Sequence, residues 1–342
     1  MHKVLIIRND KLGDFMLAWP AFSLIKQQYP DAEITALVPA YTQPMAKLCP
    51  WIDDVIIDDQ HKSILADAVY LSRKFHEHGF DASISLYSEM RTTLALWLAH
   101  IPERYGPATK LAQIFLNHRL RQKRSSSSKP EYVYNADLAR FYIADRGESP
   151  QPLQGPPYLA FATDDIKQLE QHYRQQHNIN PESKLVLLHA GSGGSAINLS
   201  PEQFAVLASQ LTTLSLAHIV LTAGPGEEDT AKALSGLMPD VPHSIYYSTE
   251  GLESFSRFIS IADLFISGST GPLHIAGALN IPIAAFYPAR RSATSLRWQT
   301  LSAQDRRLAF SPEKYSGDQD MQTINIDDAA RKIIQFMNQL YS

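Results

Sequence analysis

Residues 264–279 read Leu-Phe-Ile-Ser-Gly-Ser-Thr-Gly-Pro-Leu-His-Ile-Ala-Gly-Ala-Leu, two apolar runs on either side of a glycine-containing turn. The first run is typical of a buried strand. Gly268 and Gly271 permit unusual backbone angles, and Pro272 suits the first position of a helix that Ser269 or Thr270 can cap. The stretch therefore predicts a strand, a tight loop and a helix start. Such a helix start suits an anion such as phosphate, although an ordinary α/β turn has the same pattern.

The same alternation of strand and helix runs through the rest of the chain. Apolar runs typical of strands lie at 4–7, 33–38, 54–57, 82–86, 185–189, 217–222, 263–266 and 283–287. Segments of helical periodicity lie between them, at 15–28, 41–48, 63–78 and 90–100 in the first half. This order predicts an α/β protein with doubly wound parallel sheets, whose ligands bind at the carboxyl ends of the strands.

The length of the chain and a Pro/Gly-rich segment predict two domains. With 342 residues, the chain exceeds one typical core, and residues 147–157 have the composition of a linker. We expect a first domain over residues 1–155 and a second over 156–325. The amphipathic helix expected within 326–342 is predicted to pack back toward the first domain.

The composition narrows the class of protein. Apolar residues make up 44% and charged residues 19% of the chain, as in a soluble globular protein. A net charge of −4 gives no reason to expect nucleic-acid binding, and the single cysteine, Cys49, excludes an internal disulfide and a multi-cysteine metal site. No apolar run reaches the roughly 18 residues of a membrane span, and the residues after Met1 do not resemble a signal peptide. These features predict a cytoplasmic protein.

Residues 110–124 form a basic stretch that also contains apolar side chains. Such a stretch can bind the anionic inner face of the cytoplasmic membrane or an anionic acceptor. A solvated surface excursion is the alternative, and the pattern does not distinguish the two.

Three loops carry the candidate functional residues. Residues 8–14 follow the first strand, and Asp14 lies at a helix start, where it is either a functional carboxylate or a plain cap. In the second half, the small residues Ser192, Gly193, Gly194 and Ser195 can expose backbone N–H groups as an anion-binding nest. Gly224 and Glu227 follow the next strand.

Four motifs, in order, resemble glycosyltransferase family 9, which includes the ADP-heptose:lipopolysaccharide heptosyltransferases. Arg8-x-Asp10-x-x-Gly13-Asp14 resembles the family's opening, and residues 131–138 resemble its helix before the linker. Residues 189–198 resemble its glycine-rich donor loop, and residues 269–276 its donor-binding signature.

The resemblance implies a GT-B fold, with two facing Rossmann-like domains that bind acceptor and nucleotide-sugar respectively. It implies inverting transfer without a metal or other cofactor, with Asp14 as the general base. The acceptor side comprises Arg8, Asp10, Lys11 and Gly13, with Lys11 a cation able to keep Asp14 ionised or to bind acceptor phosphate. The donor side comprises Ser192, Gly193, Gly194, Ser195, Asn198, Gly224, Glu227, Ser269, Thr270, Gly271, Pro272, Leu273 and His274. The implied partners are an ADP-linked sugar and a lipid-linked or lipopolysaccharide glycan.

The chain departs from the best-known heptosyltransferases at two positions. Ser269 replaces an aspartate, and Asn198 lies near the place of a lysine; Arg290, Arg291 or Arg297 could replace that cation. The missing charges motivate an alternative, a GT-B protein that binds a nucleotide-sugar or glycan without turnover. A Rossmann oxidoreductase is a third interpretation, but the first loop lacks GxGxxG.

Overall fold

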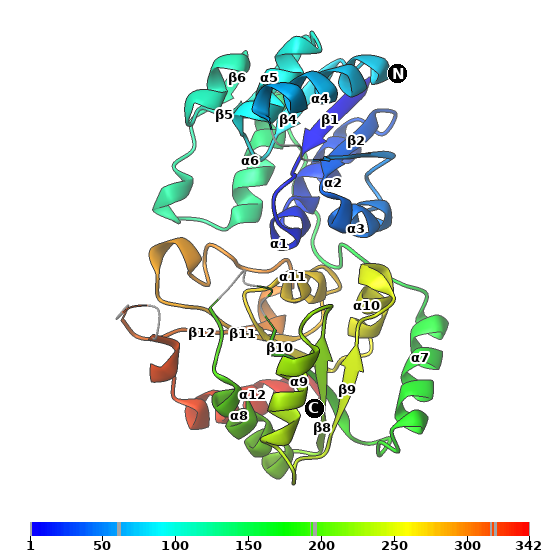
Figure 1. Ribbon diagram of the computed structural model, residues 1–342, viewed down its shortest axis with the longest axis vertical. Helices are drawn as coiled ribbons and strands as arrows, with labels where there is room; N and C mark the ends of the chain where they lie inside the picture. Colours follow the sequence, from blue (N-terminus) through cyan, green and yellow to red (C-terminus); the bar gives the residue numbers. More distant parts are fainter. Residues whose placement is uncertain are drawn as a thin grey trace. The chain divides into compact units, whose positions relative to one another are not determined.

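The computed structural model describes residues 2–59, 63–191, 193, 197–314, 317 and 320–341. The chain divides into two compact units, residues 1–155 and 156–342. Each unit is built on its own six-stranded parallel sheet (Figure 1). The predicted α/β class with two doubly wound sheets is therefore confirmed. None of the helices in the described ranges has the length and hydropathy of a membrane span.

The first unit has strand order β3-β2-β1-β4-β5-β6. The strands are β1 (Lys3–Ile7), β2 (Glu33–Val38), β3 (Asp54–Ile57), β4 (Ala82–Ser85), β5 (Glu103–Pro107) and β6 (His118–Leu120). The helices are α1 (Leu12–Met16), α2 (Trp19–Gln28), α3 (Gln43–Leu48), α4 (Ile64–His78), α5 (Met90–Leu98) and α6 (Glu131–Ala144), with short 3₁₀ helices η1 (Ala40–Thr42), η2 (Leu111–Phe115) and η3 (Arg124–Ser126). α2 packs against α6 and α4 against α5. Leu5 and Ile7 of β1 join the apolar cluster that α4 and α5 cover.

The second unit has strand order β12-β11-β10-β7-β8-β9. The strands are β7 (Lys184–His189), β8 (Ala217–Ala223), β9 (His243–Tyr247), β10 (Leu264–Gly268), β11 (Ile283–Phe286) and β12 (Arg307–Phe310). The helices are α7 (Thr163–Gln176), α8 (Pro201–Leu214), α9 (Glu228–Gly236), α10 (Gly251–Ile259), α11 (Gly271–Ala278) and α12 (Ile326–Tyr341), with 3₁₀ helices η4 (Arg291–Ala293), η5 (Gln304–Arg306) and η6 (Asp320–Thr323).

The C-terminal helix packs within the second unit, and its predicted packing toward the first domain stays a prediction. α12 packs on α8 of its own unit, and Ile333, Phe336 and Met337 enter the apolar cluster of that unit. The apolar face of α12 is therefore buried against other residues of the second unit.

The helix predicted over 15–28 is interrupted in the structure, and the break contacts a residue of the candidate site. α1 ends at Met16, and α2 restarts at Trp19 with Pro20 in its first turn. Proline has no N–H and favours the start of a helix, so it sets the restart. The carbonyl of Leu17, at the break, accepts a buried hydrogen bond from Nδ2 of Asn135 at 3.0 Å.

Candidate active site

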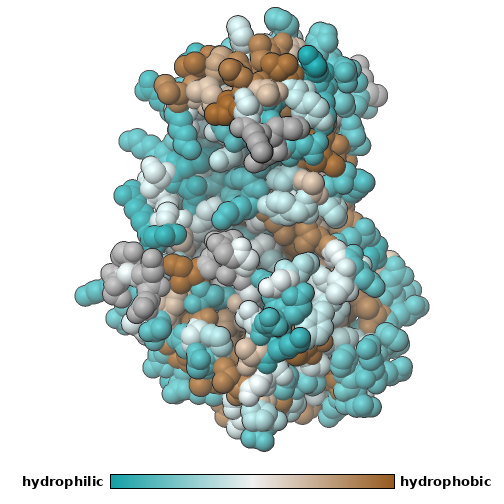
Figure 2. Space-filling model, in the orientation of Figure 1, coloured by the Kyte–Doolittle hydropathy of each residue, from teal (hydrophilic) through white to brown (hydrophobic). Residues whose placement is uncertain are grey.

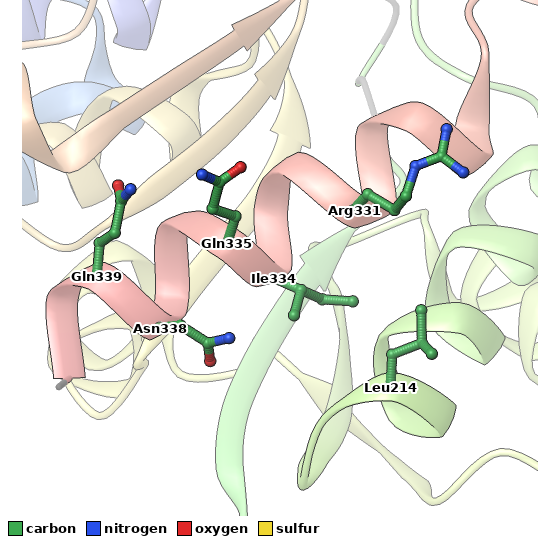
Figure 3. A pocket seen from close by; sticks show the side chains of 6 residues that line it. All are labelled: Leu214, Arg331, Ile334, Gln335, Asn338 and Gln339. Carbon is green, nitrogen blue, oxygen red and sulfur yellow. The ribbon is translucent and has the colours of Figure 1, made fainter.

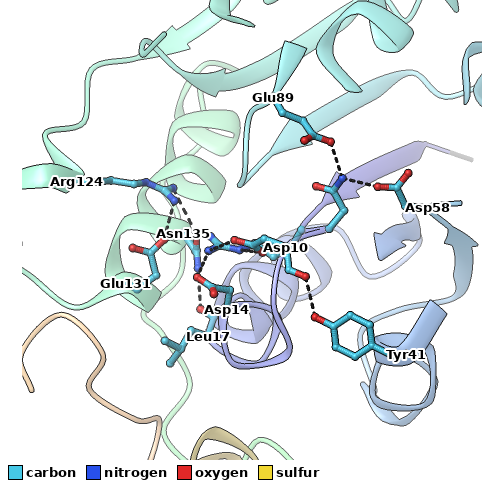
Figure 4. Close-up of polar contacts among 11 residues, drawn as sticks. Asp10, Asp14, Leu17, Tyr41, Asp58, Glu89, Arg124, Glu131 and Asn135 are labelled. Atoms are coloured by element: carbon cyan, nitrogen blue, oxygen red, sulfur yellow. Dashed lines mark hydrogen bonds and ion pairs between the residues drawn. The ribbon is translucent and has the colours of Figure 1, made fainter. Parts of the chain in front are cut away.

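Arg8 is the centre of a buried polar cluster in the first unit. It follows the central strand β1 and is 2% exposed. Its Nε donates to Oδ1 of Asp10 at 2.8 Å, and its Nη2 donates to Oδ1 of Asp14 at 2.5 Å. Its Nη1 donates to Glu131 Oε1 at 3.1 Å and to Asn135 Oδ1 at 2.9 Å. One guanidinium thus holds three carboxylates together at the carboxyl edge of the sheet (Figure 4).

The surplus of negative charge in this cluster sets the protonation of Asp14. Burial raises the pKa of Asp14 to about 7; Arg8 lowers it, while Asp10 and Glu131 raise it further. Burial opposes the charge of Arg8, but the three carboxylates outweigh it and raise the guanidinium pKa above its ordinary value. A carboxylate with a pKa near 7 can accept a proton at neutral pH, which is the property of a general base.

Asn135 and Arg124 complete the cluster from other elements. Asn135 of α6 accepts a hydrogen bond from Arg8 and donates one to the carbonyl of Leu17. It therefore connects the break between α1 and α2 to the cluster. Arg124 donates to Glu131 Oε1 at 2.7 Å and is therefore a second cation of the cluster. The sequence placed Arg124 in the basic surface stretch, whereas the structure shows it half-buried against a carboxylate that is 1% exposed.

A second ion-pair network lies beside the first and was missed from the sequence. Asp58, which follows β3, accepts from both terminal nitrogens of Arg91 at 2.5 and 2.6 Å and from Asn9 at 2.6 Å. Asn9 and Arg91 also donate to Glu89. Asp58 and Glu89 follow the ends of predicted strands, and that position was the signal that could have found them.

Lys11 is exposed, so it is either a solvated surface lysine or a cation available to acceptor phosphate, and its role stays a prediction. Lys11 is the exposed residue before α1, while Gly13 lies within that helix. The cation that contacts Asp14 is Arg8. Arg8 can reach because it follows the strand directly, whereas Lys11 lies where the chain has already turned into the helix.

The glycine-rich loop of the second unit encloses a carboxylate. Glu227 accepts from the backbone N–H of Gly193 at 3.1 Å and of Gly224 at 2.9 Å. A Cβ on Gly191 would lie 2.2 Å from the Glu227 carboxylate, so any larger residue there requires the Glu227 side chain to move. The predicted nest residue Gly193 therefore binds a side chain of the protein itself. The predicted sites Ser192, Gly194 and Ser195 lie outside the described residues.

His189 links this loop to the sheet. It ends β7, and its Nδ1 lies 3.1 Å from the carbonyl oxygen of Thr222 at the end of β8. Its Nε2 lies 3.6 Å from Glu227. Burial lowers the pKa of His189, and Glu227 only partly opposes this shift.

The stretch at 264–279 forms the predicted strand, loop and helix. Thr270 precedes α11, and Pro272 is its second residue rather than its first. The Thr270 hydroxyl lies 3.0 Å from that of Ser267 and does not cap the helix, while Ser269 is half-buried in the loop. The first N–H groups of a helix such as α11 have no partner within the helix itself, which is what an anion site needs.

Asn198 and His274 both approach this helix start. A Cβ on Gly268 would lie 2.7 Å from Oδ1 of Asn198, so this glycine is required for close approach and not for a left-handed backbone. Asn198 also donates to the carbonyl of Ala190 at 3.1 Å. Burial lowers the pKa of His274 to about 4, and its Nδ1 has no hydrogen-bond partner in the described part of the chain. Arg290 and Arg291, the suggested replacement cations, are exposed near η4.

Two surface hollows lie apart from these loops. One, of about 530 Å³, lies between the end of α8 and α12 and is lined by Leu214, Arg331, Ile334, Gln335, Asn338 and Gln339 (Figure 3). This hollow lies at the amino edge of the second sheet. The carbonyl of Leu216, just beyond α8, accepts a hydrogen bond from the backbone N–H of the first residue of β7. The other, of about 460 Å³, lies in the first unit and is lined by Arg121, Lys123, Lys129 and Arg140 among others.

Comparison with known proteins identifies the family. Residues 69–325 match the model of glycosyltransferase family 9 (heptosyltransferase). The chain belongs to glycosyltransferase family 9. A Haemophilus influenzae protein, named provisionally as a glycosyltransferase, is 41% identical over 342 residues, covering 100% of this chain and 98% of that protein. The Escherichia coli lipopolysaccharide heptosyltransferase 2 is 22% identical over 293 residues, covering 83% of this chain and 82% of that protein.

A solved structure supports the fold. The structure of the E. coli ADP-heptose lipopolysaccharide heptosyltransferase II matches with a TM-score of 0.77 and 19% identity, covering 99% of this chain and 100% of that one. The fold of this family 9 member is therefore GT-B, as the resemblance implied. Family membership makes the chain a glycosyltransferase, which favours an enzyme over both the oxidoreductase and the non-catalytic interpretation.

Proposed function

We propose that this family 9 glycosyltransferase moves a heptose from ADP-heptose to a lipopolysaccharide core or related surface glycan, with inversion at the anomeric carbon. The names of the E. coli relatives support this choice of donor and acceptor. The observation that carries the reaction type is the Arg8–Asp14 pair, in which a carboxylate is both fixed in position and given a pKa of about 7.

Asp14 acts as the general base in this proposal. The acceptor hydroxyl oxygen attacks the anomeric carbon while its proton passes to the Asp14 carboxylate. The bond from the anomeric carbon to the diphosphate oxygen breaks, and ADP leaves with that electron pair. Arg8 holds Asp14 in place and keeps a fraction of it ionised at neutral pH, which a base requires.

In this proposal, groups of the second unit stabilise the negative charge of the departing diphosphate. The free N–H groups and positive dipole end of α11 favour an anion. Neutral His274 can offer a hydrogen bond without needing protonation, because burial keeps its pKa at about 4. We propose that these groups suffice without a metal ion or other cofactor. Transfer measured with and without a chelator tests this point, and loss of activity that magnesium restores would contradict it.

The acceptor is proposed to be anionic and lipid-linked. The hollow lined by Arg121, Lys123, Lys129 and Arg140 offers four cations against one carboxylate, that of Asp137. Such a surface attracts phosphate-bearing glycans and anionic lipid. We therefore propose a cytoplasmic enzyme with peripheral contact to the inner face of the membrane through residues 110–124.

The decisive experiment supplies ADP-heptose together with a heptose-deficient lipopolysaccharide acceptor. We expect ADP release, a glycosylated product and an inverted anomeric configuration by NMR. A retained configuration would contradict the role of Asp14 as base. Because Ser269 and Asn198 lack the charges of the best-known relatives, GDP- and UDP-sugars belong in the same assay. Turnover with one of these and none with ADP-heptose would change the donor and leave the reaction type intact.

A further inference from the structure

Three exposed apolar side chains stand together at one end of the first unit. Trp97 of α5 is 50% exposed, and Leu111 and Ile114 of η2 are 73% and 60% exposed. α5 packs against η2, with the Trp97 ring 5.9 Å from that of Phe115. Figure 2 shows apolar residues gathered over this end of the unit. We call Trp97, Leu111 and Ile114 the apolar patch.

The chain around this patch is strongly basic. Residues 104–130 contain seven lysines and arginines and no aspartate or glutamate. Since the whole chain has a net charge of −4, the remaining residues carry −11. Four of the seven cations are exposed, namely Lys110, Arg119, Arg121 and Lys123, and we call them the basic collar. The segment that contains Leu111 and Ile114 is thus basic in an otherwise acidic chain.

Lys110, the residue before η2, has an unusual backbone conformation. Lys110 has φ 57° and ψ 179°, a conformation that residues with a side chain rarely adopt. It is followed directly by Leu111, the first residue of η2 and the most exposed member of the patch. A turn of this kind persists only where the surrounding structure holds it.

We propose that the apolar patch inserts into an anionic lipid bilayer while the basic collar binds its headgroups. The combination fits a lipid surface, because tryptophan favours the membrane–water interface and lysine and arginine favour anionic headgroups. A protein partner fits less well, since lysine is depleted in the centres of protein interfaces. The proposal rests on the proposed lipid-linked acceptor, and it adds apolar insertion to what could otherwise be electrostatic contact alone.

Tryptophan fluorescence reports insertion directly. Vesicles of phosphatidylglycerol and brominated phosphatidylcholine quench an indole that enters the acyl region. We expect quenching in the native protein and none in Trp97→Phe, because Trp19 is fully buried and Trp51 and Trp298 lie outside the patch. Vesicle binding without quenching of Trp97 would overturn insertion and leave electrostatic contact standing.

A pair of matched double variants tests the energetic role of the patch. Leu111→Gln/Ile114→Gln removes apolar area without changing charge, and Leu214→Gln/Leu216→Gln does the same at leucines 58% and 57% exposed in the second unit. We expect about tenfold weaker vesicle binding for the first and no change for the second. Transfer to a soluble, delipidated acceptor should stay normal in both, which separates this proposal from the proposed activity. Equal vesicle binding by the two variants, or failure of the native protein to bind these vesicles, would overturn it.

Discussion

Arg8 donates a hydrogen bond to Asp14 across 2.5 Å, yet this pairing does not keep the pKa of Asp14 at its ordinary value. Burial raises that pKa, and Asp10 and Glu131 compete for the same guanidinium and raise it further. The cluster therefore performs two functions at once. It fixes the position of the carboxylate, and it brings the pKa of that carboxylate close to neutral pH.

Replacement of Asp14 by asparagine tests its role as the base. Asp14→Asn retains the shape of the side chain but cannot accept the acceptor proton, so we expect kcat to fall by about 10² to 10⁴. Donor binding, measured by calorimetry, should be nearly unchanged. Asp59→Asn is the matched control, because Asp59 is 51% exposed and pairs only loosely with Lys74. Turnover close to normal in Asp14→Asn would remove this residue from the mechanism.

The pH dependence of transfer should follow the ionisation of Asp14. A base must be deprotonated, so kcat/KM should rise with pH through about 7. Glu131→Gln removes a negative charge that raises the pKa of Asp14, so the acid limb should move to lower pH. Glu103→Gln, at a half-buried pair with Arg146 outside the Arg8 cluster, should leave the profile in place. An acid limb that stays fixed or moves to higher pH in Glu131→Gln would contradict this coupling.

The sequence predicted the central strands of both sheets but missed strands toward their edges. β1 and β7 consist of continuous apolar runs, because both faces of these strands are buried. β5 contains Gly106 and Pro107, and β6 is the three-residue segment His-Arg-Leu at an edge. These outer strands are defined by pairing with a neighbour, which a local pattern does not record.

The position of a candidate residue after a strand could be inferred from the sequence, whereas contacts between distant residues could not. Asp14 lies in the first helix after β1, and α11 begins just after β10, so the place of both at the carboxyl edge of a sheet could be inferred. Glu131 lies 123 residues from Arg8, and only the packing of α6 beside α2 brings the two together. The sequence likewise could not show that the Glu227 carboxylate accepts a hydrogen bond from the backbone N–H of Gly193.

The close contact between Gly191 and the Glu227 side chain predicts that the methyl group added by Gly191→Ala weakens donor binding. A Cβ at residue 191 would lie 2.2 Å from the Glu227 carboxylate, so Gly191→Ala must displace that side chain. Glu227 would then lose its hydrogen bonds to the N–H groups of Gly193 and Gly224, which belong to the proposed donor side. We expect a raised KM for the donor sugar with a smaller effect on acceptor KM.

Gly236→Ala is the control for that variant, since a Cβ there meets no atom within 4 Å. Both substitutions restrict the unfolded chain in the same way, so a difference between them reports the contact with Glu227. Equal donor KM values in the two variants would show that the loop tolerates displacement of this carboxylate.

Two neighbouring aspartates should differ widely in their effect on stability. Asp58 has a fully buried side chain that accepts both terminal nitrogens of Arg91 and the amide of Asn9. Asp58→Ala leaves the buried Arg91 short of a partner, and loss of one member of a buried pair costs about 3–5 kcal/mol of unfolding free energy. Asp59→Ala breaks an exposed pair worth at most about 1 kcal/mol. Urea denaturation of both variants measures this difference, and similar midpoints would show that Glu89 and Asp67 alone can hold Arg91 in place.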